Sequence, residues 1–268
     1  MLQIAVYGSS YVILIYLADG PFVENIEYGQ LAVSIRGGFI ALSYGIFTVM
    51  FAYRYFALIK PAMLEYMTSK LGVLCLFGIF LSYGVVWAAI CEIMMYATDD
   101  ARDITRQDFV ETFNVNISEI SFLNIVYRSP NMWTVYRCWI GLGMLFMISA
   151  ASITLYCTIG YKIVQKLQDV DYVSKNTRRL HRQLLRTLAT QTAIPTIISF
   201  LPCMIVWVIP LFGVHLGNYG NIGVITLSTF PSLNALAVII LLPVYRNRVT
   251  SSISTTSTAW LRSRSETM

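Results

Sequence analysis

Three charged side chains interrupt apolar stretches of this sequence: Arg36, Glu92 and Arg137. A charge in an apolar, low-dielectric environment is costly unless it is paired or hydrogen-bonded. These groups therefore either line a cavity that holds a small molecule, with Glu92 paired to one arginine, or form an ion pair that sets helix packing. For a single charged residue, packing is the commoner role. Trp87 and Trp207 also lie in apolar stretches, where they could contact an apolar molecule or simply pack.

A second group of candidate residues is basic. Arg54 directly follows an apolar stretch, and its planar guanidinium can bind helix-end carbonyl groups, a neighbouring helix or an inserted peptide. The alternative is an interfacial anchor whose charged end reaches water. Later in the chain, arginines at helical spacings predict one basic helix face, which would meet either a protein partner or anionic lipid. Its members are Arg178, Arg179, Arg182 and Arg186.

Residues suited to metal binding or hydrolytic catalysis are few. His181 and His215 are the two histidines, and neither has a ligand-type residue four positions later. The pair Gly141-Leu-Gly143 lacks the third glycine of a phosphate-binding loop. The five cysteines include no Cys-x-x-Cys pair, so we expect small buried hydrophobes. The pattern does not favour an enzyme and predicts neither a metal nor a cofactor.

The elements that position these residues belong to a membrane protein. Of 268 residues, 56% are hydrophobic and 12% are charged, whereas soluble domains have about 45–50% and about 25%. The net charge of +5 could suggest nucleic acid as a partner. However, most basic residues lie in the segments between apolar stretches and do not alternate with aromatic residues. They therefore indicate membrane topology.

Six stretches meet or approach the roughly 20 apolar residues that a helix needs to cross a bilayer. They are residues 2–18, 31–53, 71–96, 134–160, 187–214 and 222–245. Because backbone groups in lipid must be satisfied within the segment, we expect helices, kinked at prolines in the last two. The predicted fold is all-α: a polytopic membrane helical bundle over residues 1–249, followed by a disordered cytoplasmic Ser/Thr-rich tail at 250–268.

Loop charges predict the orientation of these spans. Lys and Arg gather after the second span, before the fifth and in the tail, which places these segments and the C-terminus in the cytoplasm. Residues 19–30 and 97–133 are mainly acidic and are expected outside. The second of these loops contains Asn116-Ile117-Ser118, so Asn116 is a predicted glycosylation site.

The even number of spans leaves several interpretations open. Six spans put both termini in the cytoplasm, whereas a seven-helix protein needs its N-terminus outside. The simplest way to reconcile the six spans with a seven-helix topology is one further helix upstream of Met1. The alternatives are a true six-span transporter or channel subunit, or a signal peptide at the first span. A transporter would predict internal repeats and polar groups at the bilayer midplane, and the sequence shows neither.

Three motifs resemble the nematode serpentine seven-transmembrane chemoreceptors of the Str superfamily. Residues 182–195, with Gln-Thr-x-x-Pro, are similar to the family's sixth helix. Residues 53–61 resemble the cytoplasmic end of its third helix, with Tyr53 where rhodopsin-like receptors place an acid. Residues 230–246 resemble its seventh helix, with Asn234-Ala235 where the family usually has Asp-Pro. The first helix has no counterpart in this chain.

This resemblance implies a G-protein-coupled chemosensory receptor of the plasma membrane, in a sensory cilium if expressed there. It would bind an odorant-like small molecule from the outside and couple to a heterotrimeric G protein through Arg54, Tyr55 and the basic helix face. Arg36, Glu92, Arg137, Trp87 and Trp207 are the candidate pocket residues. The Ser/Thr-rich tail suits phosphorylation. A nonfunctional truncated receptor is a further alternative.

Overall fold

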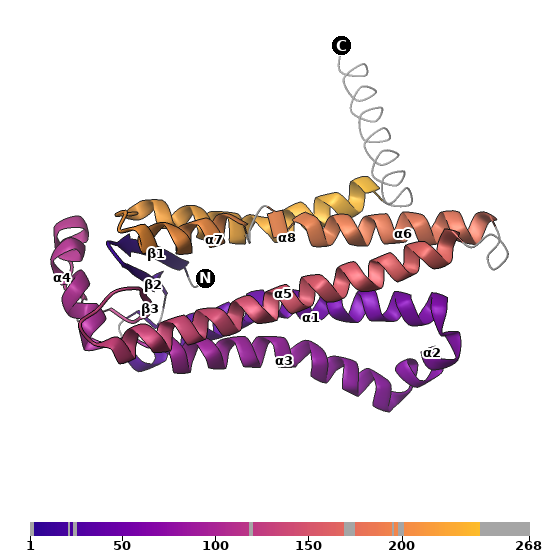
Figure 1. Ribbon diagram of the computed structural model, residues 1–268, viewed down its shortest axis with the longest axis horizontal. Coiled ribbons are helices and arrows are strands. Elements are labelled where there is room, and N and C mark those ends of the chain that lie inside the picture. Colours follow the sequence, from indigo (N-terminus) through magenta and orange to yellow (C-terminus); the bar gives the residue numbers. More distant parts are fainter. Residues whose placement is uncertain are drawn as a thin grey trace, which may run out of the picture.

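The computed structural model is an elongated bundle whose long helices run side by side along one axis (Figure 1). The structure describes residues 3–20, 22–23, 26–117, 120–168, 175–194, 196–197 and 201–241. A small sheet and the short helix α4 lie at one end of the bundle, and α2 lies at the other (Figure 1). The predicted tail at 250–268 lies outside the described residues.

The described chain contains helices and one three-stranded sheet. The helices are α1 (Ile26–Ile59), α2 (Pro61–Thr68), α3 (Lys70–Met94), α4 (Asp99–Phe113), α5 (Met132–Gln168), α6 (Lys175–Ile194), α7 (Leu201–Val208) and α8 (Asn221–Leu241). The strands are β1 (Gln3–Ser9), β2 (Val12–Asp19) and β3 (Phe122–Val126). Two short 3₁₀ segments, η3 (Ile209–Phe212) and η4 (Asn218–Gly220), connect α7 to α8.

Three of the described helices are long and apolar enough to cross a membrane. They span residues 28–59, 70–94 and 132–168, with 32, 25 and 37 residues. At 1.5 Å per residue, each exceeds the roughly 30 Å of a hydrocarbon core. They cover the predicted spans 31–53 and 134–160 completely, and the predicted span 71–96 as far as Met94. Small residues bring α1 and α3 together: a Cβ on Gly38 would lie 2.6 Å from the Gly84 carbonyl oxygen.

The first predicted span, 2–18, is wrong as a helix, because β1 and β2 form an antiparallel hairpin there. Ser9 pairs with Val12, and Tyr11 takes a left-handed backbone conformation (φ 68°) in the turn between them. The strand β3 pairs with β2 and completes the order β1-β2-β3. The sequence of a strand that is covered on both faces is a nearly continuous apolar run, and a short membrane helix has the same sequence pattern.

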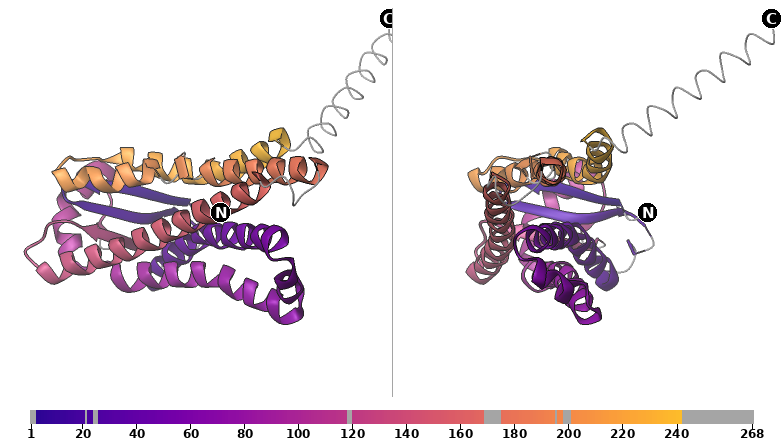
Figure 2. Two further views of the ribbon diagram at one scale, coloured as in Figure 1. Left: turned by 45° about the vertical axis from the view of Figure 1, so that its right-hand side comes forward. Right: turned by 90° about the vertical axis from the view of Figure 1, so that its right-hand side faces the viewer.

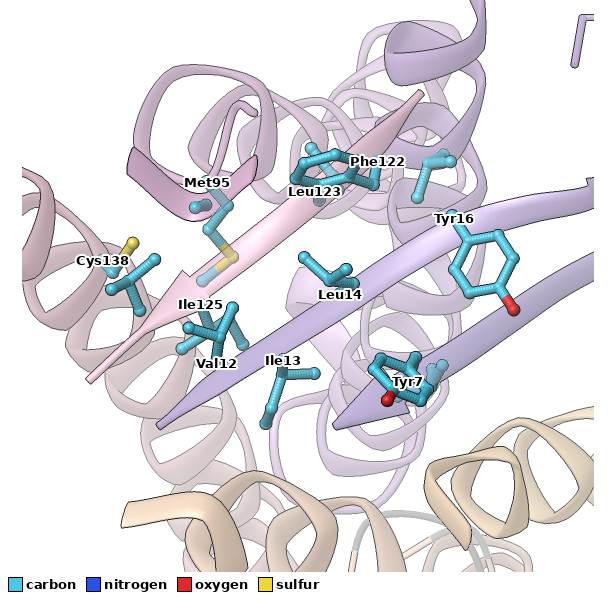
Figure 3. Packing of buried hydrophobic residues seen from close by; sticks show 14 of the residues in the cluster. Tyr7, Val12, Ile13, Leu14, Tyr16, Met95, Phe122, Leu123, Ile125 and Cys138 are labelled. Atoms are coloured by element: carbon cyan, nitrogen blue, oxygen red, sulfur yellow. The ribbon is translucent and has the colours of Figure 1, made fainter. Parts of the chain in front are cut away.

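Both faces of the sheet are covered. Tyr7 and Tyr16, diagonal neighbours on β1 and β2, pack edge-on against Phe109 of α4 with ring centroids 5.5 and 5.6 Å from it. The alternate residues, including Val6 and Ile15, face into the bundle. Turned views show the strands between the α7–α8 pair and the α1–α5 pair (Figure 2). The sheet contributes much of the main apolar core, and its buried residues include Leu14, Phe122 and Ile125 (Figure 3).

Both edges of the sheet are hydrogen-bonded by connecting segments. The Gly8 carbonyl on β1 accepts from the Gly217 amide at 2.7 Å, and the Val6 amide donates to the Asn221 side chain at 2.8 Å. On β3, the Asn124 amide donates to the Met95 carbonyl at 2.8 Å. These contacts supply the partners that an open sheet edge lacks, which is what permits a sheet inside a membrane protein.

The remaining predicted spans have different limits. The predicted span 187–214 is divided between α6 and α7, and α6 begins earlier, at Lys175, within the basic segment. Pro195, between them, lies outside the described residues. The helix α8 covers the predicted span 222–245 as far as Leu241, where the described chain ends.

The two ends of the bundle carry opposite charges. The sheet end holds α4, whose first turn contains Asp99 and Asp100; we call it the acidic end. At the opposite end, the basic end, lie α2, the C-terminus of α5 and the N-terminus of α6 (Figure 1). The arginine-rich segment of α6 is therefore far from the acidic helix, as the positive-inside rule expects of loops on opposite sides of a membrane.

Candidate ligand cavity and basic-end surface

A cavity of about 220 Å³ lies inside the bundle. Side chains from α1, α3, α5, α6, α7, α8 and all three strands line it. This volume is below the roughly 300–1,000 Å³ of pockets that hold drug-sized ligands, so a ligand of this cavity is small. Most of the lining is apolar or aromatic, as is usual for small-molecule sites. Its lining includes Ile40, Tyr44, Trp87, Tyr156, Val206 and Trp207.

Aromatic stacking organises one wall of the cavity. The ring of Tyr44 on α1 is nearly parallel to that of Trp87 on α3, with centroids 6.0 Å apart and an interplanar angle of 19°. One turn earlier on α3, Tyr83 also stacks with Tyr44, and their centroids are 6.4 Å apart. Offset stacking of this kind stabilises aromatic pairs beyond their burial. The wall therefore joins two of the long helices at the height of the cavity.

A hydroxyl network continues from this wall toward the basic end. The Thr48 hydroxyl lies 3.2 Å from that of Tyr83 and 3.3 Å from that of Tyr156. Ser152 donates to Tyr83 at 3.2 Å. The Tyr156 hydroxyl donates to the Tyr44 carbonyl at 2.7 Å, so α1, α3 and α5 share one polar cluster. Polar groups inside a membrane bundle are expected to bind one another in this way.

Of the five predicted pocket residues, the cavity contains Arg36, Trp87 and Trp207. Glu92 does not line it; its carboxylate accepts from Gln30 at 2.8 Å and from Ser34 at 2.6 Å.

Arg137 also lies elsewhere. It is 5% exposed, donates to the Tyr96 carbonyl at 3.0 Å and lies over the Tyr96 ring, 3.4 Å from its centroid. For these two charges, the packing role is the one that the described contacts support. Arg137 is covered by Tyr96 in the segment after α3, a tertiary contact that the sequence pattern does not reveal.

The loop at the acidic end is held without a disulfide. All five cysteines are free thiols; Cys91, Cys138 and Cys203 are buried, whereas Cys75 and Cys157 are exposed. Arg102 of α4 instead donates to the Ile117 carbonyl at 2.8 Å and lies over the Phe122 ring at 4.8 Å. Burial lowers the pKa of the Arg102 guanidinium, and the charge of Asp99 acts against this shift.

Asn116 is exposed in the same loop, as a glycosylation site requires. Ser118, which completes its sequon, lies outside the described residues. Glycosylation of Asn116 stays a prediction.

At the basic end, a second apolar cluster joins α1, α5 and α6. Its buried members include Phe51, Tyr156 and Leu188, and Tyr55 packs against it. Phe51 stacks on Tyr156 with centroids 5.2 Å apart. Near this cluster in the sequence, Arg54 has a buried Nη1 atom without a hydrogen-bond partner among the described residues. A donor of this kind is available to an incoming acceptor.

The predicted basic helix face is on α6. Arg179, Arg182 and Arg186 are exposed. The side chain of Arg178 lies outside the described residues. Leu185 and Leu188 of the same helix are buried against α1 and α5. The helix therefore presents arginines to its surroundings while its apolar side packs on the bundle.

Comparison with known proteins identifies the chain. A family model described as serpentine type 7TM GPCR chemoreceptor Srj matches residues 1–249. The chain belongs to this chemoreceptor family. Serpentine receptor class J-38 of Caenorhabditis elegans is 27% identical over 268 residues, covering 97% of this chain and 79% of that receptor. Serpentine receptor class r-10 of the same nematode is 25% identical over 233 residues, covering 85% and 68%. No solved structure matches the chain significantly.

Family membership confirms the predicted family and class: this receptor is a polytopic helical membrane protein of the G-protein-coupled chemoreceptor type. Its relatives are receptors rather than enzymes. The sequence interpretation missed the roles of Tyr44, Thr48 and Tyr156. Helical spacing could have found them, since Tyr44, Thr48 and Phe51 share one face of α1, and Ser152 and Tyr156 share one face of α5.

Proposed function

We propose that this receptor binds a small, mainly apolar molecule in the 220 Å³ cavity and signals to a heterotrimeric G protein at the basic end. The cavity carries the proposal, because it combines an apolar lining with few polar groups at the centre of the bundle. Arg36, Ser43 and Thr192 are among those polar groups. They suit a ligand with one hydrogen-bonding group on an apolar body.

A continuous set of contacts supports coupling between the two ends. Trp87 lines the cavity and stacks on Tyr44, whose carbonyl binds Tyr156; Tyr156 in turn stacks on Phe51 at the basic end. In this proposal, α1 and α5 have two alternative packings. A ligand that changes the Trp87–Tyr44 contact shifts the equilibrium toward the packing that it binds more tightly, by the difference between its two binding free energies. In the signalling packing, movement of α6 away from this cluster opens a site beside Arg54.

The orientation follows from charge. The basic end faces the cytoplasm and the acidic end faces outward, in accordance with the positive-inside rule. The G protein then meets the exposed arginines of α6 together with Arg54. No observation on the described residues favours the six-span transporter alternative, and the receptor relatives weigh against it.

A cavity-filling variant tests the ligand site. Gly37 lines the cavity, and a Cβ there would lie 3.5 Å from Trp87, an ordinary contact. Gly37→Leu therefore occupies cavity volume with little distortion of the backbone. A ligand found by screening volatile compounds against G-protein nucleotide exchange should activate this variant at least about tenfold more weakly, which is about 1.4 kcal/mol of binding.

Gly78→Leu is the matched control. Gly78 is exposed on α3, a Cβ placed on it would have nothing within 4 Å, and the residue does not line the cavity. This variant should respond like the wild-type receptor at equal cell-surface expression. Equal ligand responses of Gly37→Leu and the wild type would show that the ligand binds elsewhere.

A further inference from the structure

A second apolar cavity, of about 310 Å³, lies between α5 and α7. Its lining is aromatic and aliphatic apart from Ser149, whose hydroxyl donates to the Leu145 carbonyl at 3.0 Å. Because that hydroxyl already has an acceptor, the cavity suits hydrocarbon better than a polar solute. We call it the side groove. Its members include Tyr127, Trp139, Gly143, Phe146, Met204 and Leu211.

The side groove adjoins the ligand cavity. Trp87, Leu145 and Trp207 line both spaces. The three side chains come from α3, α5 and α7, and they form the boundary between the two spaces. Leu145 is 3% exposed, so opening this boundary requires motion of packed helices, which takes microseconds or longer. Such motion would connect the groove to the cavity.

The outer side of the groove belongs to the bilayer-facing surface. Phe146 is 50% exposed and Trp139 is 42% exposed, although both are large and apolar. They lie on α5, one of the helices long enough to cross a membrane. In a membrane protein, such residues are in contact with lipid chains. A molecule dissolved in the bilayer therefore meets the groove without crossing water.

The route from the acidic end is more obstructed. The sheet lies across that end of the cavity, with Val6, Ile15 and Ile125 facing inward. Its opposite face is covered by α4, and segments beside Met95 and Gly217 hydrogen-bond its edges. The hydroxyl of Tyr127, the residue after β3, also donates to the Trp207 carbonyl and ties the sheet to α7. Entry from this end requires these contacts to open.

We propose that the side groove is a lateral entrance through which an uncharged, lipophilic ligand reaches the cavity from the bilayer. This inference rests on the proposed ligand site. A lateral entrance also restricts the chemical class of the ligand. Permanently charged molecules are excluded, because transfer of a charge into hydrocarbon costs too much free energy. A medium-chain alcohol, ketone or ester partitions into the bilayer and fits an apolar groove.

Two glycines permit a matched test. Gly143 lines the groove, and nothing lies within 4 Å of a Cβ placed on it, so Gly143→Phe puts a ring into open groove space. Gly78, on α3, has the same open surroundings but lines neither cavity. Gly78→Phe therefore controls for an added aromatic ring on a lipid-facing helix surface.

The experiment uses the full-length receptor in liposomes and a medium-chain alkanol that carries a diazirine. After mixing, samples are flash-photolysed at increasing times, and labelled peptides are quantified by mass spectrometry. Fragmentation of the peptides assigns the label to single residues, because Phe39 and Ile46 of α1, next to cavity residues in the sequence, are exposed to lipid. Ile40, Tyr44 and Phe47 of α1 report the cavity. Residues 139–146 of α5 report the groove. We expect the wild type and Gly78→Phe to label the cavity at the same rate. Gly143→Phe should label it at least about tenfold more slowly.

The two proposals fail in different ways. Equal cavity labelling rates in the wild type, Gly143→Phe and Gly78→Phe would overturn the lateral entrance and leave the ligand cavity standing. Faster cavity labelling by a water-soluble diazirine sugar than by the alkanol would do the same and indicate entry from the acidic end. Absence of cavity labelling by either probe in the wild type, at any time, would overturn the ligand cavity and the entrance together.

Discussion

The hydroxyl of Tyr156 on α5 donates a hydrogen bond of 2.7 Å to the carbonyl oxygen of Tyr44 on α1. Tyr44 lines the ligand cavity, and Tyr156 is also part of the apolar cluster at the basic end. One hydrogen bond thus joins the wall of the cavity to the core that holds α6. Any displacement of α1 against α5 must change this contact.

Removing the Tyr156 hydroxyl should loosen this junction. In Tyr156→Phe, the ring keeps its stacking on Phe51, but the bond to Tyr44 is lost, at a cost of about 1 kcal/mol. We expect a lower thermal unfolding midpoint for the purified receptor and an altered ligand-independent level of G-protein activation. Tyr136→Phe, an exposed site on the same helix, is the control. Identical melting curves for both variants would contradict the role of this bond.

Arg54 should be required for coupling but not for ligand binding. Arg54→Ala removes the buried donor at the basic end, and we expect agonist-stimulated nucleotide exchange to fall by about tenfold or more. Arg54→Lys keeps the charge but loses the planar fork, so it should recover only part of the response. Lys70→Ala, an exposed cation at the same end, should leave coupling unchanged. A response unaffected by Arg54→Ala, at equal surface expression, would refute the assignment.

A cysteine pair should trap the pairing of β2, which lies within the first predicted span, with β3. Val12 and Val126 are partners across β2 and β3, and the neighbouring pairing leaves them as a non-hydrogen-bonded pair, with Cα atoms about 4.5 Å apart. Under mild oxidation, the double variant Val12→Cys/Val126→Cys should form a disulfide that peptide mapping identifies. The pair Ile13→Cys/Val126→Cys, out of register by one residue, should not. No crosslink in either pair would argue for a helix over residues 2–18.

Arg102 should stabilise the acidic-end loop more than its neighbour Arg106 does. Arg102→Ala leaves the Ile117 carbonyl without its donor, which costs about 1–3 kcal/mol. Arg106 pairs with Asp103 at 3.2 Å, and both side chains are more than half exposed, so Arg106→Ala should cost at most about 1 kcal/mol. Limited proteolysis of residues 114–121 in liposomes measures the difference. Equal cleavage rates would show that Arg102 does not hold the loop.

Some of the site was predictable, and some was not. Arg36, Trp87 and Trp207 were candidates because a charge or a large aromatic ring in an apolar span either lines a cavity or packs between helices, and the tertiary structure places these three at the cavity. The same reasoning also made Glu92 and Arg137 pocket candidates, although neither lines the cavity. Their partners, Ser34 and Tyr96, are distant in sequence and come close only through helix packing and the chain reversal after α3.

The sequence by itself determined the apolar lengths of α1, α3 and α5, the separation of basic from acidic segments and, through local motifs, the family. These features depend on residues close together in the chain. The tertiary structure decided that β1 and β2 are strands, because the covering of both faces comes from α4 and from helices far along the chain. It also decided where the cavity and the side groove lie, since each is bounded by side chains from separate elements.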